Sequence, residues 1–138
     1  MLAVALLLAG AARAGDRAPE FPSDPACWIN SPPLSLAALK GKAVLLWYYD
    51  GDCPTCRKRW PELLALSQKY AGEPIVFIAV NSGSPRDTVA RYAVGVGCPW
   101  PILVDSNRRF EKATLNEKIS LENIYQAYYI TADGRLLP

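Results

Sequence analysis

Apolar runs alternate with helical patterns along most of the chain. Two runs, Ala43–Tyr49 and Ile75–Val80, have the length of a strand and contain no charged residue. Continuous runs of this kind are typical of central strands that are buried on both faces of a sheet. Between them, residues 57–70 follow a helical pattern that Pro74 terminates. A strand, a helix and a second strand in this order predict a βαβ unit with parallel strands.

The second half of the chain continues this alternation. We expect one helix to begin with Ser84 as its N-cap and Pro85 as its first residue, and to end near Gly95–Gly97. Further along, the pattern predicts a strand, a helix, a strand and a hairpin turn at residues 102–105, 107–117, 124–130 and 132–135. The side chains expected to face the core from the two helices are Val89, Tyr92, Phe110 and Leu115. The alternation as a whole predicts the α/β fold class.

The amino-terminal segment differs in character from the rest. Residues 1–12 are apolar and lead into Arg13 and Ala14, which is typical of a secretory signal with cleavage after Ala14. The run is shorter than the about 20 residues of a transmembrane helix, although an uncleaved membrane tether stays open as the alternative. Residues 15–33 hold five of the twelve prolines and predict an extended, irregular lead-in, with Trp28 docked on the domain. Residues 34–138 form the domain itself, which we place in the periplasm or another extracytoplasmic compartment.

The amino-acid composition limits the kinds of partner and catalytic site that the chain can have. The 138 residues are 51% hydrophobic and 20% charged, which suits a single domain with one core. The net charge is +2 and there is no long basic run, so the sequence does not favour nucleic acid as a partner. The chain contains no histidine, which excludes Cys–His nucleophile pairs, Ser–His–Asp triads and zinc sites with histidine ligands.

Two cysteines separated by two residues mark the candidate reactive site. Cys53 and Cys56 enclose Pro54 and Thr55, and they lie where the first predicted strand gives way to the first predicted helix. The free N–H groups and the dipole of a helix N-terminus stabilise an anion, so we expect the pKa of Cys53 to fall and its thiolate to act as a nucleophile. Cys56 can then attack the mixed disulfide that forms. This pattern predicts thiol–disulfide exchange, and a thiolate metal site remains the alternative.

The sequence around this motif resembles a known family. The phrase Leu-Ala-Ala-Leu-Lys-Gly-Lys at residues 36–42, the apolar strand, the Cys53–Cys56 motif and Pro61 resemble the thioredoxin-like proteins of the TlpA/ResA (redoxin) group. The resemblance covers roughly residues 28–136 and implies a thioredoxin fold, with a central mixed β-sheet flanked by helices and no cofactor. It also implies that Cys53 attacks and Cys56 resolves, that the substrates are protein disulfides or dithiols, and that a membrane thiol protein donates electrons.

The chain departs from the family pattern in four respects. Many relatives carry an aromatic residue before the first cysteine, where Asp52 stands here, and thioredoxin carries a buried aspartate where Trp47 stands. Tyr125 occupies the place of the cis-proline that faces the substrate in relatives. The chain stops at Pro138, whereas the family continues with a further strand and a final helix, so we expect both to be missing here.

Two further cysteines, Cys27 and Cys98, each stand alone in the sequence. Because an exported chain meets oxidising conditions, we predict a structural disulfide between them that joins the lead-in to the domain. Two alternatives stay open. The two thiols can act as separate small apolar side chains, or either one can exchange with the Cys53–Cys56 pair.

Together these patterns predict an exported thiol–disulfide oxidoreductase without a bound metal, and the resemblance to the redoxin group implies that it works as a reductant. Three alternatives stay open. Cys53 and Cys56 suit Cu(I) as soft ligands, although related copper chaperones use a histidine that this chain lacks. The second alternative is a thiol peroxidase of the redoxin superfamily, although such an enzyme has a threonine and a proline shortly before its reactive cysteine, and this chain has Gly51 and Asp52 there instead. The third alternative is an interaction domain without catalysis.

Overall fold

The computed structural model describes residues 15–50, 54–115 and 125–137. The predicted signal segment, residues 1–14, therefore lies outside the described residues, as do Cys53 and Asp52. Tyr125 is described by its backbone alone. None of the helices described has the length and apolar character needed to cross a bilayer.

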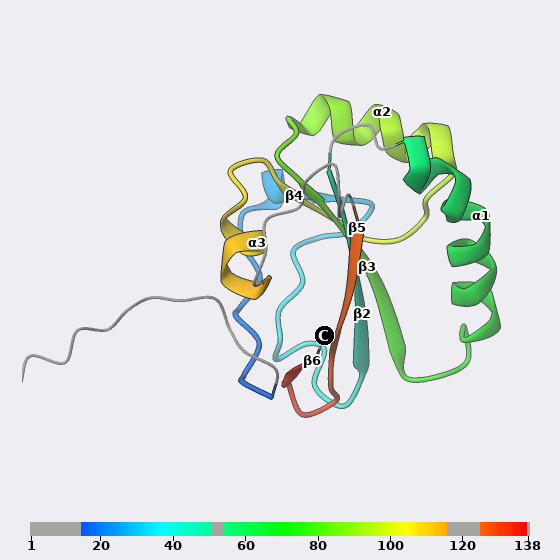
Figure 1. Ribbon diagram of the computed structural model, residues 1–138. Helices are drawn as coiled ribbons and strands as arrows, with labels where there is room; N and C mark the ends of the chain where they lie inside the picture. Colours follow the sequence, from blue (N-terminus) through cyan, green and yellow to red (C-terminus); the bar gives the residue numbers. More distant parts are fainter. Residues whose placement is uncertain (1–14, 51–53, 116–124, 138) are drawn as a thin grey trace, which may run out of the picture.

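Within the described residues, six strands form one mixed sheet (Figure 1). They are β1 (Trp28–Ile29), β2 (Ala43–Asp50), β3 (Ile75–Ser82), β4 (Ile102–Asp105), β5 (Tyr125–Ile130) and β6 (Leu136–Leu137). Their order is β1-β4-β3-β2-β5-β6, in which β2, β3 and β4 run parallel and the outer strands pair antiparallel. The predicted βαβ unit is confirmed, since β2 and β3 pair in parallel along their whole length.

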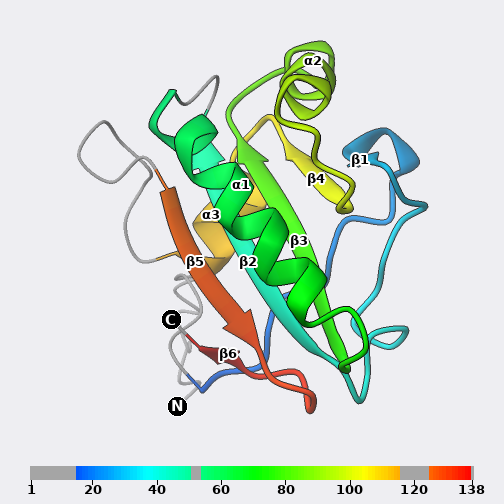
Figure 2. The same cartoon turned by 90° about the vertical axis from the view of Figure 1, so that its right-hand side faces the viewer.

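Helices cover both faces of this sheet. The long α1 (Pro54–Lys69) and α2 (Arg86–Val96) lie on one face, and α3 (Arg109–Thr114) lies on the other (Figure 2). The lead-in, with its short 3-10 helix η1 (Pro25–Cys27), packs on the same face as α3. Because strand side chains alternate between faces, β2 supplies both cores. Val44, Leu46 and Tyr48 enter the α3 side, and Leu45, Trp47 and Tyr49 enter the α1 side.

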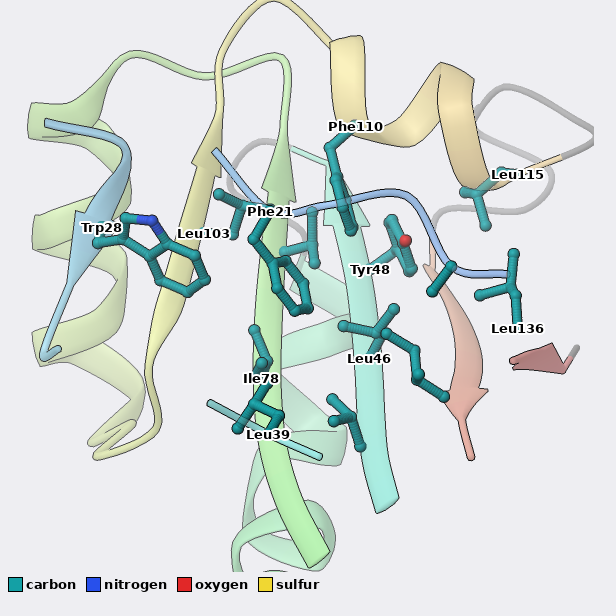
Figure 3. Close-up of a cluster of buried hydrophobic side chains, with 14 residues drawn as sticks. Phe21, Trp28, Leu39, Leu46, Tyr48, Ile78, Leu103, Phe110, Leu115 and Leu136 are labelled. Carbon is teal, nitrogen blue, oxygen red and sulfur yellow. The ribbon is translucent and has the colours of Figure 1, made fainter. Parts of the chain in front are cut away.

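The proline-rich lead-in is part of the core. Trp28 is 1% exposed and docks on the domain as expected, and Phe21 is 3% exposed. The Phe21 ring stacks on Phe110 of α3 with 5.3 Å between ring centroids, and it meets the Trp28 ring edge-on at 5.7 Å (Figure 3). The four helix side chains predicted to face inward, Phe110 among them, are all buried.

The expectation of an irregular lead-in is wrong at η1 and β1. The Asp24 carboxylate caps η1 by accepting a hydrogen bond from the Ala26 N–H, and Pro25 suits the first helical position because its missing N–H needs no partner there. β1 follows at once and pairs with β4 through Trp28↔Leu103. Asp24 and Pro25 thus favour local structure in a stretch whose proline content alone predicts none.

The start of α2 also differs from its prediction. Pro85 is the N-cap, α2 begins at Arg86, and the cap makes no side-chain hydrogen bond, so Ser84 is not the N-cap. Ser84 lies one residue earlier and is 5% exposed, and its carbonyl accepts a hydrogen bond from the Ser106 hydroxyl at 2.6 Å. The other end agrees with the sequence, since Gly97 ends α2 at φ 67, in the left-handed region that glycine adopts freely.

The carboxyl-terminal part forms a β-hairpin. β5 and β6 pair through Ile130↔Leu136, and the intervening turn holds Gly134 at φ 88, as the Asp-Gly pattern predicts. β6 takes the place of the strand that the sequence analysis expects to be missing after the Asp-Gly turn. α3 ends at Thr114, three residues before the predicted end, and residues 116–124 lie outside the described part of the chain.

Candidate active site

Cys56 lies in the first turn of α1, just after the carboxyl end of β2. It is fully buried and disulfide-bonded, whereas Cys27 and Cys98 are free thiols. Pro54 and Thr55 of the motif are exposed. The structure thus confirms the predicted junction of a buried strand and a helix at this motif. The position of Cys53 falls outside the described residues and stays a prediction.

An aromatic cluster holds the first turns of α1 against the sheet. The Tyr49 ring stacks on the Tyr92 ring of α2 at 5.0 Å and meets the Trp60 ring of α1 edge-on at 5.8 Å. The Trp60 Nε1–H donates a hydrogen bond to the Tyr92 hydroxyl at 3.2 Å. The Arg57 guanidinium lies 4.5 Å from the Tyr92 ring centroid, a cation–π distance. Cys56 belongs to the same buried cluster, so this packing fixes Cys56 in place.

Trp47 replaces the aspartate that thioredoxin has at this point of the strand. It is 4% exposed and lies in the same core cluster as Cys56. A buried indole cannot exchange a proton, so this position offers Cys56 no acid or base.

Tyr125, the residue at the predicted cis-proline place, opens β5. Its backbone pairs with Tyr49, one residue before β2 ends, so it lies beside the strand that leads into the cysteine motif. The described residues contain no cis peptide bond. The topology thus brings Tyr125 near the motif, and its substrate-facing role remains a prediction.

A charged network that the sequence analysis does not predict lies at the carboxyl ends of the parallel strands. Arg108, in the turn between β4 and α3, donates to the Asp50 carboxylate at 2.6 Å and to both carboxylate oxygens of Glu111 at 3.0 and 3.2 Å. The side chains of Arg108, Asp50 and Glu111 are 18%, 33% and 2% exposed. Burial opposes the charge on Arg108, but hydrogen bonds to the two carboxylates outweigh it and raise the pKa of Arg108.

The surroundings of Arg108 are shaped to hold it. The Asp105 carboxylate accepts hydrogen bonds from the backbone N–H groups of Phe110 and Glu111, which fixes the start of α3. Gly83 packs against the guanidinium so closely that a Cβ there would lie 2.5 Å from Nη2 of Arg108. One sequence signal for this network exists, since Asp50 is the first charged residue after the apolar run of β2.

The predicted disulfide between Cys27 and Cys98 is not formed, and both thiols are free. Cys27 packs beside the core cluster on the α3 side of the sheet, whereas Cys98 belongs to the cluster on the α1 side. The sheet therefore separates the two sulfurs, which is the reason that they cannot pair.

Both free thiols lie in surroundings that disfavour thiolate. Burial raises the pKa of Cys98 to about 11, an effect that a backbone hydrogen bond from Trp100 only partly offsets. The pKa of Cys27 is also raised, by burial first and then by the carboxylates of Asp24 and Asp105. Cys27 lines an open groove of about 840 Å³ between the lead-in and α3. Because the thiolate is the reactive form, neither cysteine is primed for exchange near neutral pH.

These features define a class of protein. The mixed sheet, a disulfide-bonded cysteine at the start of the helix after β2 and the terminal hairpin are those of a thioredoxin-like protein. The crystal structure of a thiol:disulfide interchange protein of the thioredoxin family from Chlorobium tepidum has a TM-score of 0.70 to this chain. It is 23% identical, and the match covers 92% of this chain and 85% of that one. The fold is therefore thioredoxin-like, as expected from the resemblance.

The chain belongs to the redoxin family, whose sequence model matches residues 13–130. It is 32% identical over 94 residues to the thiol-disulfide oxidoreductase ResA of Halalkalibacterium halodurans, a match that covers 68% of this chain and 52% of the relative. The ResA of Bacillus subtilis is 26% identical over 95 residues, with 69% of this chain and 51% of the relative covered. The chain thus spans about half the length of these curated relatives.

Proposed function

We propose that this chain is an extracytoplasmic thiol–disulfide oxidoreductase that exchanges disulfides with protein substrates through Cys53 and Cys56, and that it works as a reductant. The observation that carries the proposal is Cys56, which is disulfide-bonded and buried at the start of α1. Cys27 and Cys98 are free, so Cys53 is its proposed partner. The similarity to proteins named thiol-disulfide oxidoreductase supports the same reading.

In the proposed reaction, the reduced pair transfers two electrons to a client disulfide. The Cys53 thiolate attacks one client sulfur, a bond between Cys53 and that sulfur forms, and the other client sulfur leaves as a thiolate. The Cys56 thiolate then attacks the sulfur of Cys53, which breaks the mixed disulfide and releases the second client thiolate. The client thiolates take up the two protons that the thiols of Cys53 and Cys56 released, so the client becomes a dithiol and Cys53 and Cys56 become a disulfide.

The surroundings suit these roles. Complete burial of Cys56 suits a resolving cysteine, which attacks only its neighbour, and the exposed Pro54 and Thr55 offer a surface that a client can reach. We assign Tyr125 to the substrate-facing edge, since its backbone lies beside the end of β2. A membrane dithiol protein is the proposed donor that restores the reduced pair.

The proposed compartment depends on residues 1–14, as a cleaved signal or as an uncleaved tether. Fractionation of cells that express the full chain should place the protein outside the cytoplasm, with Gly15 as its first residue if cleavage occurs. Recovery in the cytoplasmic fraction would contradict this part of the proposal.

Reduction of insulin disulfides, with dithiothreitol as electron source, tests the activity. The wild-type protein should accelerate the reaction, and Cys53→Ser should abolish the acceleration. Cys56→Ser, reduced beforehand and freed of dithiothreitol, should form a mixed disulfide with insulin that persists, because the thiol that resolves it is absent. The matched control replaces both Cys27 and Cys98 with alanine and should retain the acceleration. A wild-type protein no faster than dithiothreitol alone, or an active Cys53→Ser variant, would refute the proposed function.

A further inference from the structure

We propose that the end of the sheet farthest from Cys56 is a membrane-facing surface, on which Arg17, Lys40 and Lys42 bind the headgroups of anionic lipids. The inference goes beyond the proposed function, because it concerns the opposite end of the domain from the start of α1. Figures 1 and 2 both show the first described residues beside β6, at this end of the sheet.

Three segments that are distant in the sequence build this surface, at residues 15–18, 40–42 and 131–135. The Gly41 N–H donates a hydrogen bond to the Ala132 carbonyl at 3.0 Å, and the Ala18 N–H donates one to the Gly134 carbonyl at 2.8 Å. Arg17 also forms an isolated antiparallel β-bridge with residue 135. The backbone that carries the three cations is therefore fixed as one surface.

Arg17, Lys40 and Lys42 line one pocket of about 190 Å³, which we call the basic pocket. All three residues are exposed, and within residues 15–50, 54–115 and 125–137 no ion pair involves their side chains. The pocket also contains buried apolar side chains, which are Leu39, Val44 and Ile130. The cationic groups are thus available to an anion from outside the domain.

The acidic residue that lines the basic pocket is Asp133, and its carboxylate already has partners. It accepts hydrogen bonds from the Thr131 hydroxyl and from the Arg135 guanidinium. The chain has 15 basic and 13 acidic residues, so twelve of each sign remain when the three cations and the one carboxylate of the pocket are set aside. The net charge of +2 is therefore concentrated at this end of the domain.

The path of the chain favours lipid as the partner. Residues 1–12 are apolar, and Gly15 follows them closely in the sequence. The Gly15 N–H donates to the Leu136 carbonyl at 2.7 Å, and the Gly15 carbonyl accepts from the Arg135 guanidinium at 3.0 Å. If the apolar residues enter a bilayer, these contacts hold the basic pocket beside the headgroups, where lysine and arginine attract anionic lipid.

This orientation also suits the other end of the domain. The pocket includes Val44, near the start of β2, whereas Cys56 lies just after the end of β2. An eight-residue strand is about 25 Å long, so a domain that rests on lipid through the basic pocket presents the start of α1 to the solution.

Binding of the purified full chain to sedimented vesicles tests the surface. The vesicles contain phosphatidylcholine alone or phosphatidylcholine mixed with phosphatidylglycerol, at about 0.1 M salt, where the Debye length is about 10 Å. Each cation close to an anionic bilayer contributes about fivefold to partitioning. The triple variant Arg17→Gln, Lys40→Gln, Lys42→Gln should therefore bind the anionic vesicles about tenfold or more weakly than the wild type, with unchanged binding to the neutral vesicles.

The matched control removes three exposed cations elsewhere, with the variant Arg86→Gln, Arg91→Gln, Arg109→Gln. These residues lie on α2 and α3, which begin after the carboxyl ends of β3 and β4. The net charge changes by the same amount, yet binding should stay within about twofold of the wild type, because charges beyond a Debye length are screened. Residues 1–14 are the same in every protein, so their own affinity for a bilayer cancels in the comparison.

A loss on anionic vesicles that is confined to the pocket variant supports the proposal. Equal binding of the wild type to both kinds of vesicle overturns it, as does a loss in the control as large as that in the pocket variant. Lys42→Gln alone should lose about fivefold, which keeps the test decisive if the triple variant is unstable. The proposed function is judged separately, because insulin reduction is measured without vesicles and the pocket variant should retain it.

Discussion

The sequence predicts that a disulfide joins the lead-in to the segment around Cys98. In the structure, hydrogen bonds from the side chain of Asn30 make this connection instead. Its side-chain amide donates one hydrogen bond to the Cys98 carbonyl at 2.9 Å and one to the Trp100 carbonyl at 3.0 Å. Its backbone has φ 65, which asparagine tolerates better than most residues. We predict that Asn30→Ala lowers the free energy of unfolding by about 3 kcal/mol, with about 1 kcal/mol for each hydrogen bond and about 1 kcal/mol for the left-handed backbone.

Asn30→Gly separates the two contributions. Glycine adopts this φ without steric cost but cannot donate the hydrogen bonds, so its loss should be about 2 kcal/mol, smaller than that of alanine. Urea unfolding followed by tryptophan fluorescence gives both values, and equal slopes for all three proteins justify the comparison. A loss below about 1 kcal/mol for Asn30→Ala would refute the reasoning, as would a glycine variant that is less stable than the alanine variant.

Three further changes test other parts of the structure. Phe21→Ala should lower the free energy of unfolding by about 3–5 kcal/mol, because it removes a buried ring from the core, and a loss below about 1 kcal/mol in urea unfolding would contradict the placement of the lead-in. Gly83→Ala places a Cβ at φ +85 and against the Arg108 guanidinium, so thermal unfolding should show a clear drop in Tm, and an unchanged Tm would contradict both the backbone strain and the close packing expected at this position. Burial raises the pKa of Cys98 from 9.0 to about 11. The contribution of the buried thiol to stability is therefore complete below pH 9. It is lost as the pH rises towards 11, because the thiol then ionises in the unfolded chain but not in the folded one. The difference in unfolding free energy between the wild type and Cys98→Ala should therefore fall by about 2–3 kcal/mol over this range, and a flat difference would be incompatible with that pKa.

The elements around the cysteine motif follow from local sequence patterns. The apolar runs predict β2 and β3 correctly because both strands are buried on both faces of the sheet. Nearly every side chain in such a strand is apolar, so the sequence shows it as a continuous run. The position of Cys56 at the start of α1 follows from the same local reasoning, since it needs only the end of one run and the start of a helical pattern. The resemblance to the redoxin group then predicts the fold, which the comparisons confirm.

Features that depend on the order of strands could not be predicted in this way. Arg108 and Asp50 are 58 residues apart, and they meet because β2 and β4 both end at one edge of the sheet. Cys27 and Cys98 look like natural disulfide partners by elimination, yet the sequence does not show that they lie on opposite faces of the sheet. β1 is only two residues long, and no pattern of alternating side chains can develop over that length.

The reduction potential of the Cys53–Cys56 pair tests the central claim most directly. The protein is equilibrated in dithiothreitol buffers of known potential, and the two cysteines are counted by mass spectrometry after alkylation, with Cys27 and Cys98 as internal references that stay reduced. We predict one two-electron transition near the value of thioredoxin, about −270 mV. A transition near about −120 mV, the value of a strong disulfide donor, or no transition shared by the two cysteines, would contradict the account.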